Sequence, residues 1–502
     1  MSSNENIFLA NKRMKRIFLT GLVLILIFMV SGCSKKKYFF EKELAFPKII
    51  TNDQKIKLAA YLVPTSRQYE WQKTEMNAFI HFGMNTFTNR EWGNGFEDPA
   101  LFNPTAFDAE QWVKTLKNAG FGILILTAKH HDGFCLWPTE TTTHSVASSP
   151  WRNGEGDVVR EVKDACDKYK MKFGIYLSPW DRNAKSYGDS PQYNALFIKQ
   201  LTELLSNYGE IDEVWLDGAK GEEPLERVQE YDWEAFYKVI DQLQPRAVKA
   251  VMGNDVRWVG NEKGFARETE WSVTPLQPNI DVATIKENER LGISPAAEDL
   301  GSRELIVRAK KLYWYPAEVN VSLRPGWFYH PEEDQQIKTL KQLVDIYYKS
   351  VGRNAVLLLN VSPDTRGLLP ETDVKRLEQF GNYIASTFDE NKLVDGKVAW
   401  TTKQGGFREY DLLENDTINT IMLQEDIKQG QRVESFRVDA QMGNGWKKLG
   451  EGTTIGYKRL LKFNDVATSK IRITILETRD EANILNVGAF YAPPTEEYSA
   501  NK

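Results

Sequence analysis

The chain has 502 residues, of which 41% are hydrophobic and 26% charged, and its formal net charge is −5. Such values are ordinary for a soluble globular protein, and the length is enough for two or three domains. A slightly acidic chain without a basic stripe is poorly suited to binding nucleic acid, so we expect no nucleic-acid partner.

The first 33 residues differ from the rest of the chain. Basic residues within positions 12–16 precede an apolar run over 17–30, and Ser-Gly-Cys33 follows. A charged segment, an apolar segment and small residues in this order are typical of a secretory signal. A transmembrane anchor is the alternative reading, but the run is short against the roughly 20 residues that a membrane span needs.

The end of this segment resembles the lipobox of bacterial lipoproteins, because Cys33 directly follows Val-Ser-Gly. The resemblance implies that residues 1–33 are a lipoprotein signal and that a lipid on Cys33 anchors the protein to a membrane. Residues 34–54 are then expected to be a tether. No acidic run follows Cys33 to indicate export to the cell surface. The expected location is therefore the bacterial periplasm, with the outer membrane as the favoured anchor.

From residue 55 to about 390, strand-like and helix-like segments alternate. Strands are predicted at residues 78–82, 123–126, 173–177, 213–216, 248–252, 318–323 and 355–361. Helices are predicted at residues 107–118, 158–169, 193–208, 231–243, 335–348 and 374–385. This alternation is typical of α/β proteins with a parallel sheet.

The alternation of strand-like and helix-like segments ends at about residue 390. Short strand-like runs at 420–423, 433–438 and 469–476 are separated by turn residues, and no long amphipathic helix is predicted among them. Closely spaced short strands are typical of a β-sandwich. We therefore predict a β-sandwich domain over residues 391–502.

Three of the predicted strands end in polar residues. One runs through Trp215 and Leu216 to Asp217, one ends in His130 and His131, and one contains Tyr176 and continues into Ser-Pro-Trp. Since the carboxyl ends of parallel strands meet at one edge of a sheet, these groups are expected to face a common ligand. Asp217 alone would be equally well explained as a helix N-cap or turn residue, because Asp-Gly is a common turn pair.

The motifs at these strand ends resemble those of the α-L-fucosidases of glycoside hydrolase family 29. The resemblance covers residues 55–390 and is carried by Phe79-Ile80-His81-Phe82-Gly83, Lys129-His130-His131-Asp132-Gly133-Phe134 and Trp215-Leu216-Asp217-Gly218. It implies a catalytic (β/α)8-like TIM barrel, commonly followed by a β-sandwich. It also implies a fucosylated oligosaccharide or glycoconjugate as substrate, an exo-acting retaining mechanism, and Asp217 as the nucleophile.

A retaining glycosidase needs a second carboxyl group as acid and base. The stretch Arg257-Trp258-Val259-Gly260-Asn261-Glu262 resembles the branch of the family that cleaves α-1,3 and α-1,4 fucosyl linkages, known as subfamily B. That resemblance implies Glu262 as the acid/base and branched, Lewis-type glycans as substrates. Other acidic residues compete for this role: Glu268, Glu270, Glu298 and Glu318.

Histidines at strand ends suit a sugar ligand, because a neutral imidazole offers one donor and one acceptor. His81, His130 and His131 all lie at predicted strand ends, although each could be purely structural. By resemblance to the family, the substrate-binding set also includes Glu91, Trp92, Tyr176 and Trp215. Trp327 is added because residues 324–330 are rich in groups that bind ligands, and its ring could cover the methyl group of fucose. For Tyr176 and Trp215, filling of the barrel interior is the alternative, and for Trp327 it is anchoring of a loop.

No cofactor or metal is expected. His130 and His131 are adjacent and lack the His-x-x-x-His spacing that places two ligands on one helix face. Two other functions stay open. One is a broad-specificity α-L-fucosidase that acts on α-1,2 or aryl fucosides. The other is a non-catalytic, glycan-binding surface lipoprotein, against which the presence of both Asp217 and Glu262 argues.

Overall fold

The computed structural model describes residues 42–221 and 228–496. The predicted signal over 1–33 with Cys33, and residues 34–41 of the predicted tether, lie outside these ranges. In the described part of the chain, no helix is long and apolar enough to cross a membrane.

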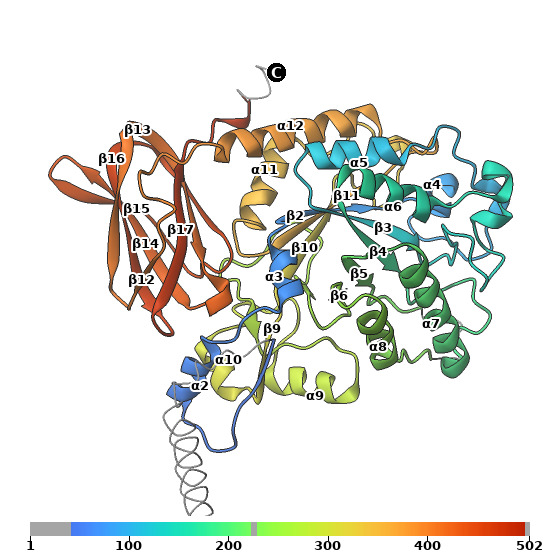
Figure 1. Cartoon of the computed structure of the whole chain (residues 1–502), viewed down its shortest axis with the longest axis horizontal. Helices are drawn as coiled ribbons and strands as arrows, with labels where there is room; N and C mark the ends of the chain where they lie inside the picture. Colours follow the sequence, from blue (N-terminus) through green and yellow to red (C-terminus); the bar gives the residue numbers. More distant parts are fainter. Residues whose placement is uncertain (1–41, 222–227, 497–502) are drawn as a thin grey trace, which may run out of the picture. The chain divides into compact units, whose positions relative to one another are not determined.

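The central feature is a sheet of eight parallel strands that curls into a barrel (Figure 1). Its strands are β2 (Met76–Ile80), β3 (Ile123–Lys129), β4 (Lys172–Leu177), β5 (Glu213–Leu216), β6 (Val248–Val251), β7 (Arg257–Trp258), β10 (Ala317–Ser322) and β11 (Val356–Val361). Strand β2 pairs with both β3 and β11, and a parallel bridge between Ala250 and Val256 links β6 to the start of β7. The predicted (β/α)8-like barrel is therefore confirmed.

Helices follow most of the strands and cover the outside of the barrel (Figure 1). They are α5 (Ala109–Asn118), α6 (Val158–Tyr169), α7 (Ser190–Asn207), α8 (Trp233–Leu243), α11 (Leu340–Lys349) and α12 (Glu371–Phe388). The side chains of four aspartates, Asp108, Asp157, Asp189 and Asp232, accept backbone N–H groups at the starts of α5 to α8. Such N-caps satisfy donors that the first helical turn leaves free, so they set where these helices begin.

Between β6 and β10 the regular alternation breaks down. Strand β7 has only two residues, and the chain then forms β8 (Val273–Thr274), α9 (Val282–Leu291), α10 (Arg303–Arg308) and β9 (Lys311–Trp314). Strand β9 also pairs with β1 (Glu43–Ala45). Part of the segment predicted to be a tether thus belongs to a sheet, and α2 (Asn52–Ala59) begins before residue 55 because Thr51 caps it.

Shorter helices complete the structure, the last of them between two strands of the C-terminal sheet. They are α3 (Ser66–Gln72), α4 (Met84–Thr88), and the 3-10 helices η1 (Pro99–Leu101), η2 (Val146–Ser148), η3 (Trp151–Gly154), η4 (Pro331–Glu333) and η5 (Ile427–Gln429). Helix α3 matters for the site described below, because Trp71 on it packs with the aromatic residues of the barrel interior.

Alternation along each strand separates the barrel interior from the helix-facing core. Phe79, Tyr176 and Trp215 form one interior cluster, whereas Ile80 and Val214 belong to the core under the helices. Because side chains alternate between faces of a strand, positions 81 and 217 share the inward face with 79 and 215. The interior is packed by side chains, and the polar residues at positions 81 and 217 lie at its carboxyl end.

The C-terminal part is a six-stranded antiparallel sheet around its own apolar core, drawn from orange to red in Figure 1. Its strands are β12 (Trp400–Thr402), β13 (Phe407–Glu425), β14 (Val433–Met442), β15 (Gly445–Gly452), β16 (Arg459–Thr478) and β17 (Ala482–Phe490). The pairing of β13 with β16 shifts register twice, which bends the sheet over its core. The predicted β-sandwich is confirmed. It contacts the barrel through a hydrogen bond of 3.1 Å between the Tyr348 and Thr420 hydroxyls.

Candidate active site

Asp217 directly follows β5 at the carboxyl end of the barrel. The Tyr176 hydroxyl donates to its Oδ2 at 2.9 Å, and the Ala219 N–H donates to its Oδ1 at 2.8 Å. The latter contact is the turn geometry expected of an Asp-Gly pair, so the turn and site interpretations both hold. The side chain is 24% exposed. The carboxylate is thus held in a fixed orientation while part of it stays open to a ligand.

The three predicted histidines meet next to Asp217. Their rings lie 5.5 Å apart for His81 and His130 and 4.1 Å apart for His130 and His131, measured between centroids. His131 Nε2 lies 3.9 Å from Asp217 Oδ2. All three side chains are buried. The structure therefore brings together residues that come from the ends of β2, β3 and β5.

Hydrogen bonds assign the ring protons of two of these histidines. His81 Nδ1 lies 2.7 Å from Asn360 Oδ1, which is an acceptor because the Asn360 amide nitrogen donates elsewhere. His131 Nδ1 lies 2.7 Å from Ser178 Oγ, whose hydroxyl donates to the Trp180 carbonyl. Both rings therefore carry their proton on Nδ1 and keep Nε2 as an acceptor.

His130 has the opposite arrangement. The Asn85 amide nitrogen lies 3.4 Å from His130 Nδ1, and it can only donate. A neutral ring then keeps its proton on Nε2. The cluster thus offers acceptors on two rings and a donor on the third, which suits the vicinal hydroxyls of a sugar, since each hydroxyl both donates and accepts.

Burial keeps all three imidazoles neutral. It lowers the pKa of His81 to about 3, against the opposing effect of the hydrogen bond with Asn360. Burial also lowers the pKa of His130 well below its usual range, and the neighbouring histidines act in the same direction. The pKa of His131 is lowered by burial as well, although the charge of Asp217 opposes the shift. The hydrogen-bonding pattern of the cluster therefore persists across the neutral pH range.

Glu262 and Asp217 line the same cavity, which has a volume of about 340 Å³. The Glu262 residue is exposed overall, but neighbouring atoms partly enclose its carboxyl group. This partial burial raises the pKa of Glu262, a hydrogen bond from the Trp327 side chain opposes the shift, and the charges of Asp217 and Glu91 add to it. The surroundings of Glu262 thus favour proton binding by its carboxyl group.

None of the four competing acidic residues lines this cavity. Glu268 forms ion pairs with Arg353 and Arg459, and Glu270 is buried between Arg257 and Arg267. Glu318 lies inside the barrel, where it accepts a hydrogen bond from Trp215. Glu298 is exposed on the segment between α9 and α10. Of the five acidic residues weighed in the sequence, only Glu262 lines this cavity together with Asp217.

Glu91 is held by the loop that carries Trp327. Its carboxylate accepts the Trp327 N–H at 2.9 and 3.0 Å and the Phe328 N–H at 3.1 Å, and lies 2.7 Å from His330 Nε2. Trp327 itself is half-buried with its ring 5.2 Å from that of His81. The carboxylate therefore fixes this loop over the site, and Trp327 both anchors the loop and lines the edge of the histidine cluster.

The remaining predicted aromatic residues occupy three different environments. Trp92 is 57% exposed and stands edge-on to the rings of His131 and Trp180. Tyr176 is buried with its hydroxyl on Asp217. Trp215 belongs to the interior cluster and also lines the cavity. For Tyr176 and Trp215, barrel filling and contact with the site are therefore compatible.

The structure adds residues that the sequence analysis missed. Asn360 orients His81, and Ser178 orients His131. The cavity that contains Glu262 is also lined by Asn320 and Trp258. A hydrogen bond of 2.8 Å joins these two side chains. Asn360 and Asn320 both lie near the carboxyl ends of apolar strands. The signal that pointed to His130 and Asp217, a polar residue where a buried strand ends, would have found them as well.

Within the described ranges, no group of three or more His, Cys, Asp or Glu side chains could hold a metal ion.

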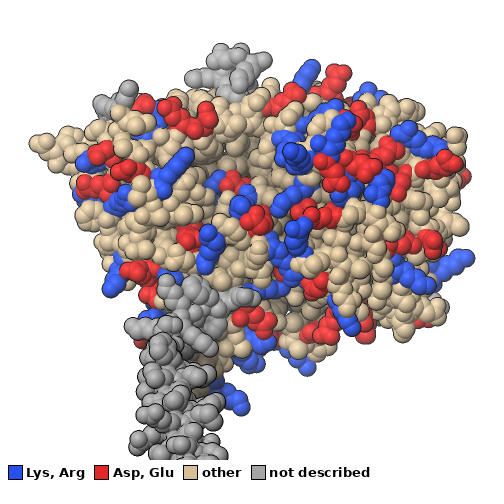
Figure 2. Space-filling model, in the orientation of Figure 1, with Lys and Arg blue, Asp and Glu red and all other residues tan. Residues whose placement is uncertain are grey.

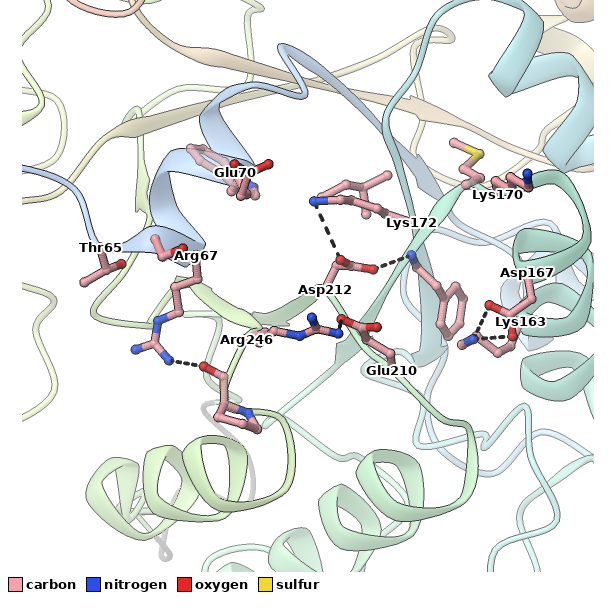
Figure 3. Close-up of a pocket in the computed structure, with 16 residues that line it drawn as sticks. Thr65, Arg67, Glu70, Lys163, Asp167, Lys170, Lys172, Glu210, Asp212 and Arg246 are labelled. Carbon is pink, nitrogen blue, oxygen red and sulfur yellow. Dashed lines mark hydrogen bonds and ion pairs between the residues drawn. The ribbon is translucent and has the colours of Figure 1, made fainter. Parts of the chain in front are cut away.

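A second cavity, of about 690 Å³, opens at the amino ends of β3 to β6 (Figure 3). Several of its charged side chains are paired with one another, as for Lys163 with Asp167 at 2.5 Å and Lys172 with Asp212 at 3.8 Å. Acidic and basic residues are also interspersed over the face shown in Figure 2.

The site combines an open carboxylate, a second carboxyl group whose pKa is raised, and neutral imidazoles. A model of the α-L-fucosidase family matches residues 56–387. Alpha-L-fucosidase 1 of Arabidopsis thaliana is 41% identical over 460 residues, which cover 85% of this chain and 87% of that protein.

Solved structures show the same relationship. A crystal structure of a Bacteroides ovatus α-L-fucosidase homologue has a TM-score of 0.89 at 60% identity and covers 91% of this chain and 78% of that one. A structure of a Ruminococcus gnavus GH29 fucosidase in complex with fucose has a TM-score of 0.76 at 32% identity and covers 86% of this chain and 95% of that one.

Proposed function

The chain belongs to the α-L-fucosidase family, and on that premise we propose that it is an exo-acting, retaining enzyme that releases α-1,3- and α-1,4-linked fucose from branched glycans. One observation carries the proposal. Asp217 and Glu262 line a single cavity, and burial and nearby charges raise the pKa of Glu262. Two carboxyl groups in different protonation states are what a retaining glycosidase requires.

In the first step, an Asp217 oxygen attacks the anomeric carbon of fucose, and the bond from that carbon to the leaving oxygen breaks. Glu262 gives its proton to the leaving oxygen, so that the departing sugar leaves as an alcohol. In the second step, the Glu262 carboxylate takes a proton from water, and the resulting hydroxide oxygen replaces Asp217 at the anomeric carbon. Each residue then has its starting charge again.

The groups around Asp217 hold the sugar in this proposal. The Nε2 atoms of His81 and His131 accept hydrogen bonds from fucose hydroxyls, and Nε2 of His130 donates a hydrogen bond to one. Trp92 and Trp327 flank these histidines and provide aromatic surface for the apolar side of the sugar. The fucose bound in the structure of the R. gnavus relative supports a fucose site in this fold.

The linkage preference rests on residues 257–262, whose pattern is that of the α-1,3/1,4-specific branch. In the structure, Trp258 and Glu262 from this stretch both line the cavity. A ring beside the acid/base suits the flanking sugar of a branched glycan, because an aromatic face can cover a pyranoside. Activity on α-1,2-linked and aryl fucosides is the alternative.

The decisive experiment measures free fucose released by the chain lacking residues 1–33. The substrates are a Lewis a or Lewis x trisaccharide, an α-1,2-fucosylated oligosaccharide and an aryl fucoside. The proposal expects the highest kcat/KM on the Lewis trisaccharide. A clear preference for the aryl or α-1,2 substrate would contradict the α-1,3/1,4 preference and favour the broad-specificity alternative. Glycan binding measured by calorimetry without any fucose release would favour a non-catalytic binding protein.

The stereochemistry is tested separately. NMR of the freshly released sugar should show the α-anomer first, because two successive inversions retain the configuration. Initial appearance of the β-anomer would contradict the role proposed for Asp217 as nucleophile.

The cellular location is also a proposal. The lipobox-like Val-Ser-Gly-Cys33 supports a lipid-anchored protein on the periplasmic face of the outer membrane. Expression with a labelled fatty acid should label the wild-type chain and leave Cys33→Ala unlabelled. Equal labelling of both would exclude Cys33 as the modified residue.

A further inference from the structure

Two carboxyl groups are buried inside the barrel. Glu213 begins β5 and Glu318 lies on β10, and their residues are 0% and 1% exposed. The indole N–H of Trp71 donates to Glu213 Oε2 at 2.9 Å, and that of Trp215 donates to Glu318 Oε2 at 2.7 Å. The two carboxyl groups lie within hydrogen-bonding reach of each other, so that a proton on one could be donated to the other. The proposed reaction uses neither of them.

The remaining oxygen of each group presents a problem of hydrogen bonding. Oε1 of Glu213 and Oε1 of Glu318 are both fully buried, and neither receives a hydrogen bond from an N–H or hydroxyl group of the described residues. A buried carboxylate oxygen without a donor is costly, and two ionised carboxylates in contact also repel each other. A single proton between the two groups removes both difficulties, because it makes one group a donor to the other.

The surroundings favour keeping that proton on Glu213. Burial raises the pKa of Glu213 well above its usual range, and the charges of Glu318 and Asp212 act in the same direction. Burial also raises the pKa of Glu318, to about 7, while its hydrogen bonds with Trp215 and Glu213 oppose the shift. Glu213 and Glu318 contact the two indole N–H groups and each other. Among the described residues, no Lys or Arg forms an ion pair with either carboxyl group that would stabilise a second negative charge.

The pair is connected to the site through aromatic rings. Trp215, which Glu318 holds, lines the cavity with Asp217, and its ring lies 5.4 Å from that of Tyr176, whose hydroxyl donates to Asp217. On the other side, Trp71 lines the cavity at the amino end of the barrel. The indole of Trp71 therefore lies between Glu213 and that cavity.

We propose that Glu213 and Glu318 share one proton and, through the indole of Trp215, act as positioning residues that hold Tyr176 and Asp217 in their catalytic geometry. This inference rests on the fucosidase function proposed above. Neither residue touches the substrate. Their effect should therefore appear in kcat more than in KM, because Asp217 and Tyr176 lie at the reacting carbon and the binding histidines have other supports.

The first test compares two replacements of similar size at one position. Glu318→Gln keeps an oxygen for the Trp215 N–H and offers an amide N–H to Glu213, so kcat should stay close to wild type. Glu318→Leu removes both hydrogen bonds, so kcat should fall about tenfold or more with little change in KM. Equal kcat for folded Gln and Leu variants would overturn the positioning role. If Glu318→Leu does not fold, Trp215→Phe removes the same hydrogen bond from the other side and should show the same loss of kcat.

The second test observes the proton without using activity. Infrared spectra at neutral pH should contain the carbonyl stretch of buried protonated carboxyl groups, to which Asp132 and Glu425 can also contribute because burial raises the pKa of each to about 7. The difference spectrum between wild type and Glu213→Gln/Glu318→Gln should therefore show the loss of one such carbonyl stretch. An unchanged band in the two proteins would place the proton elsewhere and overturn the proposal.

Thermal unfolding gives the matching pH dependence. A carboxyl group whose pKa is raised in the folded state stabilises the fold below its unfolded pKa, and this contribution is lost as pH rises through the folded pKa. The wild-type Tm should therefore fall relative to that of the double Gln variant between the ordinary pKa of Glu and about pH 7, the pKa of Glu318. Parallel Tm curves would contradict a shared proton. Since neither readout needs turnover, an inactive wild-type enzyme would refute the proposed function and leave this pair testable.

Discussion

Both ends of the barrel carry acidic residues, but the two ends differ in whether these residues form ion pairs with Lys or Arg. At the amino end, a cavity of about 690 Å³ is lined by charged side chains of which several form ion pairs with one another, including Lys163 with Asp167 and Arg246 with Glu210 (Figure 3). At the carboxyl end, a cavity of about half that volume, 340 Å³, contains Asp217 and Glu262, neither of which is in an ion pair with Lys or Arg among the described residues. Free hydrogen-bonding capacity, rather than size, distinguishes the functional cavity.

The largest effect is expected from Asp217, at the carboxyl end of β5. Asp217→Ala should lower kcat by roughly 10³-fold or more, because no other group is placed to attack the anomeric carbon. Asp212, just before the same strand at the other end, provides a matched control. Asp212→Asn keeps the acceptor for the Phe173 N–H and should leave kcat/KM unchanged. A comparable loss of kcat/KM in the two folded variants would contradict the assignment of catalysis to the carboxyl end of the barrel.

A smaller effect is expected from Glu262. Glu262→Gln should lower kcat roughly 10²- to 10⁴-fold on a glycan substrate, because the leaving sugar then departs without a proton. An aryl fucoside with an acidic phenol needs little protonation, so its first step should be much less affected. Initial-rate measurements on both substrates check this, and an equal loss on the two would assign the acid to another group. Glu268→Gln, at an ion-paired glutamate outside the cavity, is the control.

Removing one histidine should have a moderate effect. His81→Phe leaves a fucose hydroxyl without its acceptor and should lower kcat/KM about tenfold or more. His144 is also buried, but it does not contact the cluster and packs against Phe134. In folded His144→Gln, kcat/KM should stay at the wild-type value. A wild-type kcat/KM for folded His81→Phe would remove His81 from the sugar site.

Replacing Trp327 should shift the pH at which kcat/KM falls on the alkaline side of its pH profile. The hydrogen bond from Trp327 lowers the pKa of Glu262, against the raising effect of burial. Trp327→Phe removes that donor, so the pKa of Glu262 should rise. Because Glu262 must be protonated for the first step, the fall of kcat/KM at high pH should move to higher pH. A limb that stays in place or moves down would show that another group controls it.

The smallest effect is expected from the amino end. Arg246→Ala breaks the exposed pair with Glu210 and should change the free energy of unfolding by less than about 1 kcal/mol. It should leave kcat/KM unchanged on every substrate. Denaturant titration and initial rates measure the two quantities, and a loss of activity would indicate a function for the amino-end cavity.

Much of the barrel could be predicted from local patterns. The expected bounds of β5, 213–216, and of α6, 158–169, match the structure, because a continuous apolar run marks the strand and Asp157 caps the helix. Helix α11 begins five residues later than expected, at Leu340 rather than 335, because Thr339 and Gln342 form a capping box there. Strand β7 was missed because two residues, Arg257 and Trp258, carry no periodic signal.

The sequence by itself determined the family and the order of strand ends at which the polar residues stand. Apolar runs and caps depend on near neighbours, so a linear pattern is enough to reveal them. Only the tertiary structure decided which acidic residue shares a cavity with Asp217. It also decided that Glu91 holds the Trp327 loop and that the Trp215 indole donates to Glu318. That last pair is 103 positions apart in the chain, and closing the barrel brings together residues that no local pattern connects.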